Sequence, residues 1–132
     1  LEHIKDDRAS VRKLSGLVKE GGVLLLSVPA YQWLFSYHDE VLHHFRRYYP
    51  GTLTEVLRPH FTIERMTFFN SFCLPPGILF RKILGGNRKD SDTGRGEAFN
   101  GLFTLLGDFE TKWLGARLNI PFGTSLLAIC RR

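Results

Sequence analysis

The start of the chain shows two hydrophobic patterns, one after the other. Apolar residues recur three and four positions apart between residues 11 and 18, with Asp6 and Asp7 before them and two glycines after them. This spacing predicts an amphipathic helix that begins at an acidic N-cap and ends at glycine. The next run, residues 23–28, is apolar almost throughout and ends at Pro29, which is typical of a strand covered on both faces in a parallel sheet. Together they predict the second half of a strand–helix–strand unit whose first strand would precede the first residue.

The rest of the chain predicts two more main helices and two more strands, with loops and short helices between them. Residues 31–49 mix aromatic and polar side chains without a clean period, as in a structured loop with a short helix. Pro50, at a favoured first position of a helix, and Pro59 bound a predicted helix. The remaining segments are a strand over 61–69, a turn and short helix over 70–86, a mobile polar loop over 87–97, a helix over 99–119 and a final strand over 123–130 inside the sheet.

Composition indicates one globular domain. The 132 residues are 43% hydrophobic and 23% charged, a balance typical of soluble domains and unlike that of disordered or fibrous chains. The longest uncharged runs, residues 21–37 and 66–80, each contain proline and are shorter than the roughly 20 apolar residues that a membrane-spanning helix needs. No secretory signal opens the chain, so we expect a cytoplasmic protein whose two cysteines are reduced and at least partly buried.

The formal charge of +5 is not concentrated in one stretch. Basic minus acidic residues give +1 over 1–20, 0 over 38–65, +2 over 81–97 and +2 over 108–132. A surface that follows a phosphate backbone usually carries a concentrated stripe of lysine and arginine. We therefore expect no nucleic acid among the partners.

Several segments, in order along the chain, resemble a known enzyme family. They are residues 1–4 (LEHI) with the acidic pair at 6–7, residues 17–22 (LVKEGG) with the strand at 24–29, residues 36–48 (SYHD through HHFRRY), and residues 121–127 (PFGTSLL). In this pattern the chain resembles the C-terminal half of a class I S-adenosylmethionine-dependent methyltransferase of type 11 or 12. The resemblance implies an α/β fold over residues 1–132, a partial domain with the fifth, seventh and sixth strands of a Rossmann-like sheet in that order, the seventh antiparallel, and flanking helices.

The resemblance also implies a cofactor. Such enzymes bind S-adenosylmethionine through a GxGxG turn after a buried first strand. The glycines of this chain at 85–86 and at 94 and 96 lie in its late, polar part and do not follow a buried strand. We therefore expect weak or no binding of S-adenosylmethionine by this chain alone, with Leu1, Glu2 and His3 forming a wall beside the cofactor in the intact parent. The parent would transfer the methyl group to a small molecule or a lipid.

The loop after residue 29 would line the acceptor pocket, because ligands in open α/β sheets bind beyond the carboxyl ends of strands. Methylation of an oxygen or nitrogen releases a proton that imidazole can accept near neutral pH, which makes His38 and His43 the candidate catalytic residues. Arginine suits an anionic group, and the candidate substrate-binding residues are Tyr31, Trp33, Arg46, Arg47 and Tyr48. A purely structural role of the loop is an equal alternative.

The same loop offers ligand types for zinc or iron in His38, Asp39, His43 and His44. Their spacing matches no established metal motif, so we expect no metal there. A metal-dependent hydrolase is accordingly the least favoured functional class.

A non-catalytic interaction module is the main alternative to the enzyme. Apolar residues between 68 and 80, followed by Arg81 and Lys82, would suit the surface of a membrane, although packing over the sheet is the commoner use of such residues. If strands are missing from one side of the sheet, its unpaired edge favours a homodimer.

Overall fold

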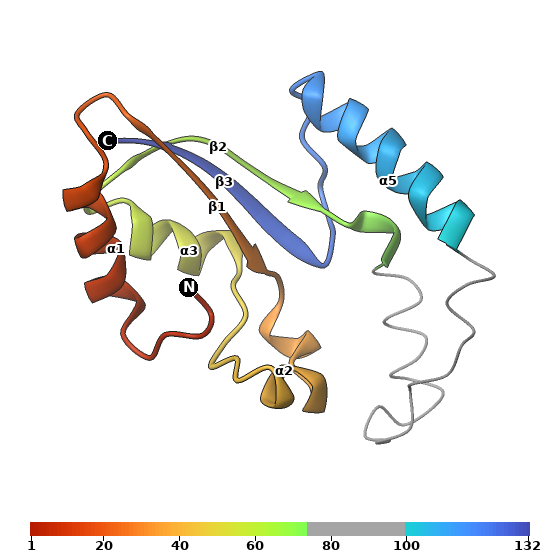
Figure 1. The fold of residues 1–132 in the computed structure, drawn as a ribbon, viewed down its shortest axis with the longest axis horizontal. Coiled ribbons are helices and arrows are strands. Elements are labelled where there is room, and N and C mark those ends of the chain that lie inside the picture. Colours follow the sequence, from red (N-terminus) through yellow and green to blue (C-terminus); the bar gives the residue numbers. More distant parts are fainter. Residues whose placement is uncertain (74–99) are drawn as a thin grey trace.

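The computed structural model describes residues 1–73 and 100–132, which form a small α/β domain. Its helices and strands follow the order expected from the hydrophobic pattern (Figure 1). They are α1 (Asp7–Leu17), β1 (Val23–Pro29), the 3₁₀ helix η1 (Gln32–Leu34), α2 (Tyr37–Val41), α3 (Pro50–Leu57), β2 (Thr62–Phe69), the 3₁₀ helix η2 (Ser71–Cys73), α5 (Asn100–Gly115) and β3 (Ser125–Arg131). The predicted mobile loop, and most of the predicted turn and helix at 70–86, lie outside the described residues.

The three strands form one sheet in the order β1-β3-β2. The last strand, β3, lies in the middle and runs antiparallel to both neighbours, as predicted for the final strand. A register shift between Ile63 and Arg65 marks an irregularity in β2. Since β1 and β2 are both antiparallel to β3, they run parallel to each other. Their carboxyl ends therefore lie at the same end of the sheet.

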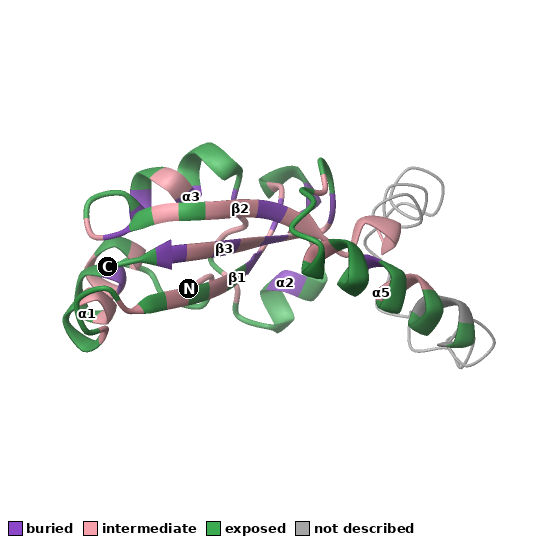
Figure 2. Ribbon diagram, turned by 90° about the horizontal axis from the view of Figure 1, so that it is seen from above, coloured by how far each residue is buried: buried purple, intermediate pink, exposed green. Residues whose placement is uncertain are grey.

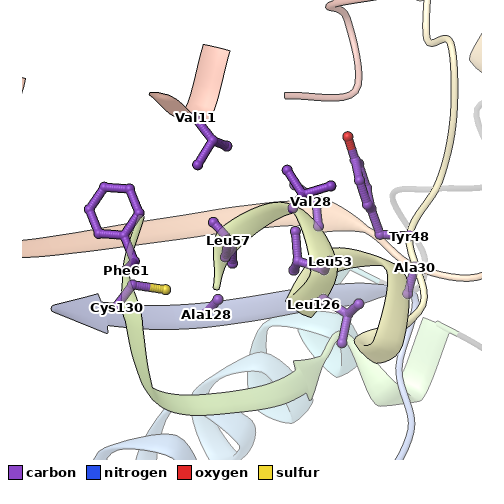
Figure 3. Close-up of a cluster of buried hydrophobic side chains, with 11 residues drawn as sticks. Val11, Val28, Ala30, Tyr48, Leu53, Leu57, Phe61, Leu126, Ala128 and Cys130 are labelled. Carbon is purple, nitrogen blue, oxygen red and sulfur yellow. The ribbon is translucent and has the colours of Figure 1, made fainter. Parts of the chain in front are cut away.

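The hydrophobic core lies between the sheet and the pair α1 and α3, which pack on the same face (Figures 1 and 3). Val11 of α1, Leu57 of α3 and Leu126 of β3 are all fully buried in this cluster. The predicted acidic cap of α1 is present, because the side chain of Asp6 accepts a hydrogen bond of 2.9 Å from the backbone N–H of Ala9. Both cysteines are free, Cys130 in the core and Cys73 half-buried, and burial raises the pKa of the Cys130 thiol to about 11.

The opposite face of the sheet corrects one prediction. We expected β1 to be covered on both faces, but the side chains of Val23 and Leu25 are 53% and 64% exposed. Successive side chains of a strand point to opposite faces, and both α1 and α3 cover the face that carries Leu24 and Leu26. Figure 2 shows the strands open to view on the other side, apart from α5 near one end. An apolar run thus indicates a strand but cannot say which of its faces is covered.

Two polar anchors attach α5 to the end of β2. The buried carboxylate of Glu110 accepts hydrogen bonds from the backbone N–H groups of Asn70 and Ser71, at 2.8 and 2.9 Å. The guanidinium of Arg65 donates to the backbone carbonyl oxygens of Leu114 and Leu118. These contacts hold the helix beside the sheet.

Within the described residues, no helix has the length and apolar character needed to cross a bilayer.

Candidate functional site

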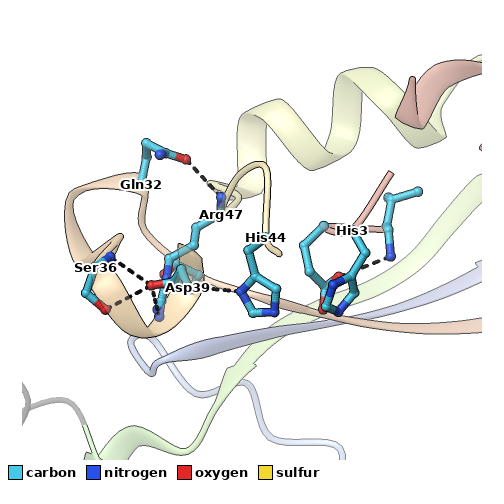
Figure 4. A network of polar contacts seen from close by, with 9 residues as sticks. His3, Gln32, Ser36, Asp39, His44 and Arg47 are labelled. Carbon is cyan, nitrogen blue, oxygen red and sulfur yellow. Dashed lines mark hydrogen bonds and ion pairs between the residues drawn. The ribbon is translucent and has the colours of Figure 1, made fainter. Parts of the chain in front are cut away.

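A polar network lies in the loop that follows β1, centred on the carboxylate of Asp39 in α2 (Figure 4). Asp39 is the third residue of this short helix, where its Oδ2 accepts hydrogen bonds from the backbone N–H and the hydroxyl of Ser36, at 2.8 and 3.1 Å. The bond from the backbone N–H of Ser36 is the one that the third helical residue makes in a capping box. The local sequence therefore starts the helix and aims the carboxylate back into the loop.

The guanidinium of Arg47 binds this carboxylate with two parallel hydrogen bonds. Its Nε lies 2.8 Å from Oδ1 of Asp39 and its Nη2 lies 2.9 Å from Oδ2. The side-chain oxygen of Gln32 accepts a third bond of 2.8 Å from the backbone N–H of Arg47. Full burial alone would raise the pKa of Asp39, but the hydrogen bonds from Arg47, His44 and Ser36 outweigh it and lower the pKa to about 2. Asp39 is therefore an ionised, fully enclosed anchor.

The imidazole of His44 joins the network from the other side. Its Nδ1 lies 2.9 Å from Oδ1 of Asp39. Because an ionised carboxylate only accepts hydrogen bonds, Nδ1 must be the donor, and the lone pair of the neutral ring is then on Nε2. The carboxylate thus sets both the tautomer and the direction of the ring.

The first residues of the chain lie against His44. The backbone N–H of Phe45 donates to the carbonyl oxygen of Glu2 at 2.8 Å, and the rings of His3 and His44 meet edge to face with centroids 4.6 Å apart. Oε1 of Glu2 lies 3.8 Å from Nε2 of His3. Burial opposes ionisation of Glu2, but hydrogen bonds from the backbone and the terminal amine hold its pKa below the usual value. Two of the candidate cofactor residues, Glu2 and His3, are therefore in contact with the loop after β1.

The structure places Arg46 and Tyr48 in a second cluster, around Asp7 at the start of α1. Nη1 of Arg46 lies 2.6 Å from Oδ2 of Asp7, and the hydroxyl of Tyr48 donates to the same oxygen at 2.9 Å. Burial, and then the negative charge of Asp7, raise the pKa of Tyr48 well above its usual value. A hollow of about 380 Å³ adjoins this cluster. Both side chains thus have internal partners, and so does Arg47 at Asp39.

The candidate aromatic residues lie at the carboxyl ends of β1 and β2. The ring of Tyr31 stacks on Phe68 of β2, with centroids 5.3 Å apart, and packs beside Trp33 at 5.6 Å. Tyr31 adopts a backbone φ of +62°, in the left-handed region that non-glycine residues rarely adopt. Trp33 is half exposed. These rings form one wall of the region where a ligand of an α/β sheet would bind.

The two candidate catalytic histidines lie outside the network. His38 and His43 are both exposed, and neither ring contacts Asp39 among the described interactions. The sequence pattern indicates His44 only as one of four metal-type side chains in the loop and says nothing of its contact with the first residues. The segment D-x₄-H-x₂-R, which places one carboxylate before both of its later partners, is the signal from which the network could have been predicted.

Comparisons with known proteins returned no match for this chain among family models, curated proteins or solved structures.

Proposed function

We propose that this chain is the acceptor-side part of a cytoplasmic S-adenosylmethionine-dependent methyltransferase that acts on a small molecule or a lipid. The observation that carries the proposal is the packing of Glu2 and His3 against His44. It joins the segment that resembles the family's cofactor wall to the segment that resembles its acceptor loop. The sheet order β1-β3-β2, with β3 antiparallel, is also the order that the resemblance implies.

The described residues fit only one side of such a cofactor site, because within residues 1–73 and 100–132 no strand leads into a glycine-rich turn. S-adenosylmethionine would supply an electrophilic methyl group on a sulfonium centre. The work of the protein in such a transfer is to orient the acceptor and to remove its proton. His44 is better placed for proton removal than His38 or His43. Its Nδ1 is bonded to Asp39 and its ring meets the ring of His3, so Nε2 is the nitrogen left to accept a proton. Asp39 is then a positioning residue, held in turn by Arg47.

The coding sequence that precedes Leu1 is the first test. The proposal requires it to encode a buried strand ending in an acidic residue and a GxGxG turn. A different upstream sequence would contradict the assignment.

The second test is methyl transfer by the product of the whole coding region, with tritiated S-adenosylmethionine and fractionated small-molecule and lipid extracts as acceptors. We expect His44→Gln to lower kcat strongly with little change in the affinity for S-adenosylmethionine. His38→Gln, in the same loop but exposed, is the matched control. Equal activity of both variants would remove His44 from the reaction. Tight one-to-one binding of S-adenosylmethionine by residues 1–132 alone, measured by titration calorimetry, would overturn the partial-site assignment.

The exposed apolar row of α5 favours a second candidate function, an interaction module that lies on a membrane surface. Leu105, Phe109 and Trp113 follow one another at intervals of four residues and are 67%, 61% and 42% exposed. Residues four apart lie on the same side of a helix, so the three side chains form one apolar stripe. A stripe of this kind suits the headgroup region of a bilayer. Co-sedimentation with vesicles tests it without reference to catalysis.

A further inference from the structure

Three metal-type ligands converge where the first residues meet the loop after β1. Glu2, His3 and His44 each offer one ligand atom, and these atoms all lie within 4.8 Å of one another. The side chains of Glu2 and His44 are largely buried, at 17% and 11% exposed, whereas His3 is 53% exposed. Glu2 and His3 are neighbours in the sequence and His44 lies far along the chain from them, so only the folded chain brings His44 to His3 (Figure 4).

We propose that Glu2, His3 and His44 bind a divalent transition-metal ion such as Zn²⁺. Two imidazoles and one carboxylate are ligands that zinc and its neighbours bind well, and three protein ligands leave a position open for water or a ligand. Metal–nitrogen bonds of about 2.0–2.1 Å require ligand atoms roughly 3.3 Å apart in a tetrahedral site. The side chain of His3 is the most exposed of the three, so it is the one with room to rotate toward this spacing.

The surroundings of His44 are those of a metal ligand. Histidines that bind metals commonly donate their other ring N–H to a carboxylate, which fixes the tautomer and makes the free nitrogen a better ligand. Asp39 does this for His44 at 2.9 Å, and Arg47 keeps Asp39 in place through two further bonds. The Nε2 of His44, which would bind the ion, is therefore oriented before any ion arrives.

The carboxylate of Glu2 completes the set from the side of the N-terminal segment. Its Oε1 lies on the side of His3, 3.8 Å from Nε2. This oxygen is the one that would bind the ion. His38 and His43 are exposed and lie outside this set.

This proposal does not depend on methyl transfer. The ion would occupy the Nε2 lone pair of His44 that proton removal would use, so the two roles exclude each other at any one moment. Metal binding is measured with the ion alone, and it succeeds or fails whatever the outcome of a methylation assay.

The experiment is calorimetric titration of the untagged, chelator-treated chain with Zn²⁺, repeated with Co²⁺ to follow the visible absorption of the bound ion. We expect one ion per chain. His3→Ala and His44→Ala should each weaken binding by roughly tenfold or more, and Asp39→Asn by roughly tenfold through its effect on His44. His38→Ala and His43→Ala, the matched controls, should bind as the unchanged chain does.

His3→Ala is the decisive variant, because His3 is half exposed and its loss leaves the core untouched. Circular dichroism checks that each variant is folded. The proposal is overturned if the unchanged chain does not bind the ions at one per chain, or if folded His3→Ala binds Zn²⁺ as well as the unchanged chain does. Equal weakening by His38→Ala would likewise show a diffuse histidine surface in place of a site.

Discussion

Replacing Asp39 by asparagine should be among the most destabilising single changes in the loop after β1. The carboxylate is fully buried and accepts five hydrogen bonds, from Ser36 (two), His44 and Arg47 (two). Asparagine keeps the shape but leaves the guanidinium of Arg47, which is only 15% exposed, without its counter-charge. Removing one partner of a buried ion pair costs about 3–5 kcal/mol.

The depressed pKa of Asp39 gives a second measure of the same interactions. A fall from the ordinary 3.8 to about 2 corresponds to about 2.5 kcal/mol of stabilisation by the ionised form. Between these two figures we expect a loss of about 3 kcal/mol for Asp39→Asn. Glu40→Gln, one residue along the same helix and exposed, is the matched control and should change the free energy of unfolding by less than about 0.5 kcal/mol.

Urea denaturation followed by circular dichroism measures both variants. With an m-value of about 1.5 kcal/mol per molar for a domain of this size, the midpoint of Asp39→Asn should fall by roughly 2 M. A loss of less than about 1 kcal/mol, or one equal to that of Glu40→Gln, would show that Asp39 does not hold the loop.

The stability difference between the unchanged chain and Asp39→Asn should depend on pH, in a direction that the pKa of Asp39 sets. The folded pKa of Asp39 lies below its unfolded value, so its stabilisation is present above pH 3.8 and is lost as the pH falls toward 2. The stability difference between the unchanged chain and Asp39→Asn should therefore shrink by about 2 kcal/mol from neutral pH to about pH 2. Subtracting the variant removes the contributions of Glu2 and Asp7, whose pKa values are also lowered. A difference that stays constant over this range would refute the assignment of the low pKa.

Three further predictions concern the rest of the domain. A Cβ at Gly123 would lie 2.3 Å from the backbone oxygen of Phe69, so Gly123→Ala should lower the free energy of unfolding in urea by roughly 1–3 kcal/mol. Gly16→Ala, in open space on α1, is the control and should raise it by roughly 0.5–1 kcal/mol. Similar effects of the two substitutions would contradict the close approach at Gly123. Among the described residues, β1 has one unpaired edge and an exposed apolar face, which predict a homodimer in sedimentation equilibrium. Leu25→Lys should return it to the monomer because charge blocks edge pairing. An unchanged chain that stays monomeric at high concentration would refute this. If α5 contacts lipid, Phe109→Glu should lower co-sedimentation with vesicles, and binding that persists would count against the membrane module.

Much of the backbone plan was readable from local patterns. The acidic cap at Asp6 and the period of the following apolar residues predicted α1, and Pro50 marked the start of α3, because helix capping and helical spacing are interactions between residues a few positions apart. The central place of β3 in the sheet was also predicted correctly. The covering of both faces of β1 was not, since the side on which helices pack depends on the paths of chain segments far from the strand.

The sequence by itself thus determined where most helices and strands lie and that one carboxylate, Asp39, precedes a histidine and an arginine at short spacing. Only the tertiary structure decided that the ring of His44 contacts that of His3 and that Leu25 is exposed. It also decided that Arg46 and Tyr48 bind the carboxylate of Asp7. The physical reason is the range of the interactions. Hydrogen bonds of caps and the periods of helices and strands act within a few residues, whereas the meeting of the first residues with the loop after β1 requires the packing of α1 and the strand between them.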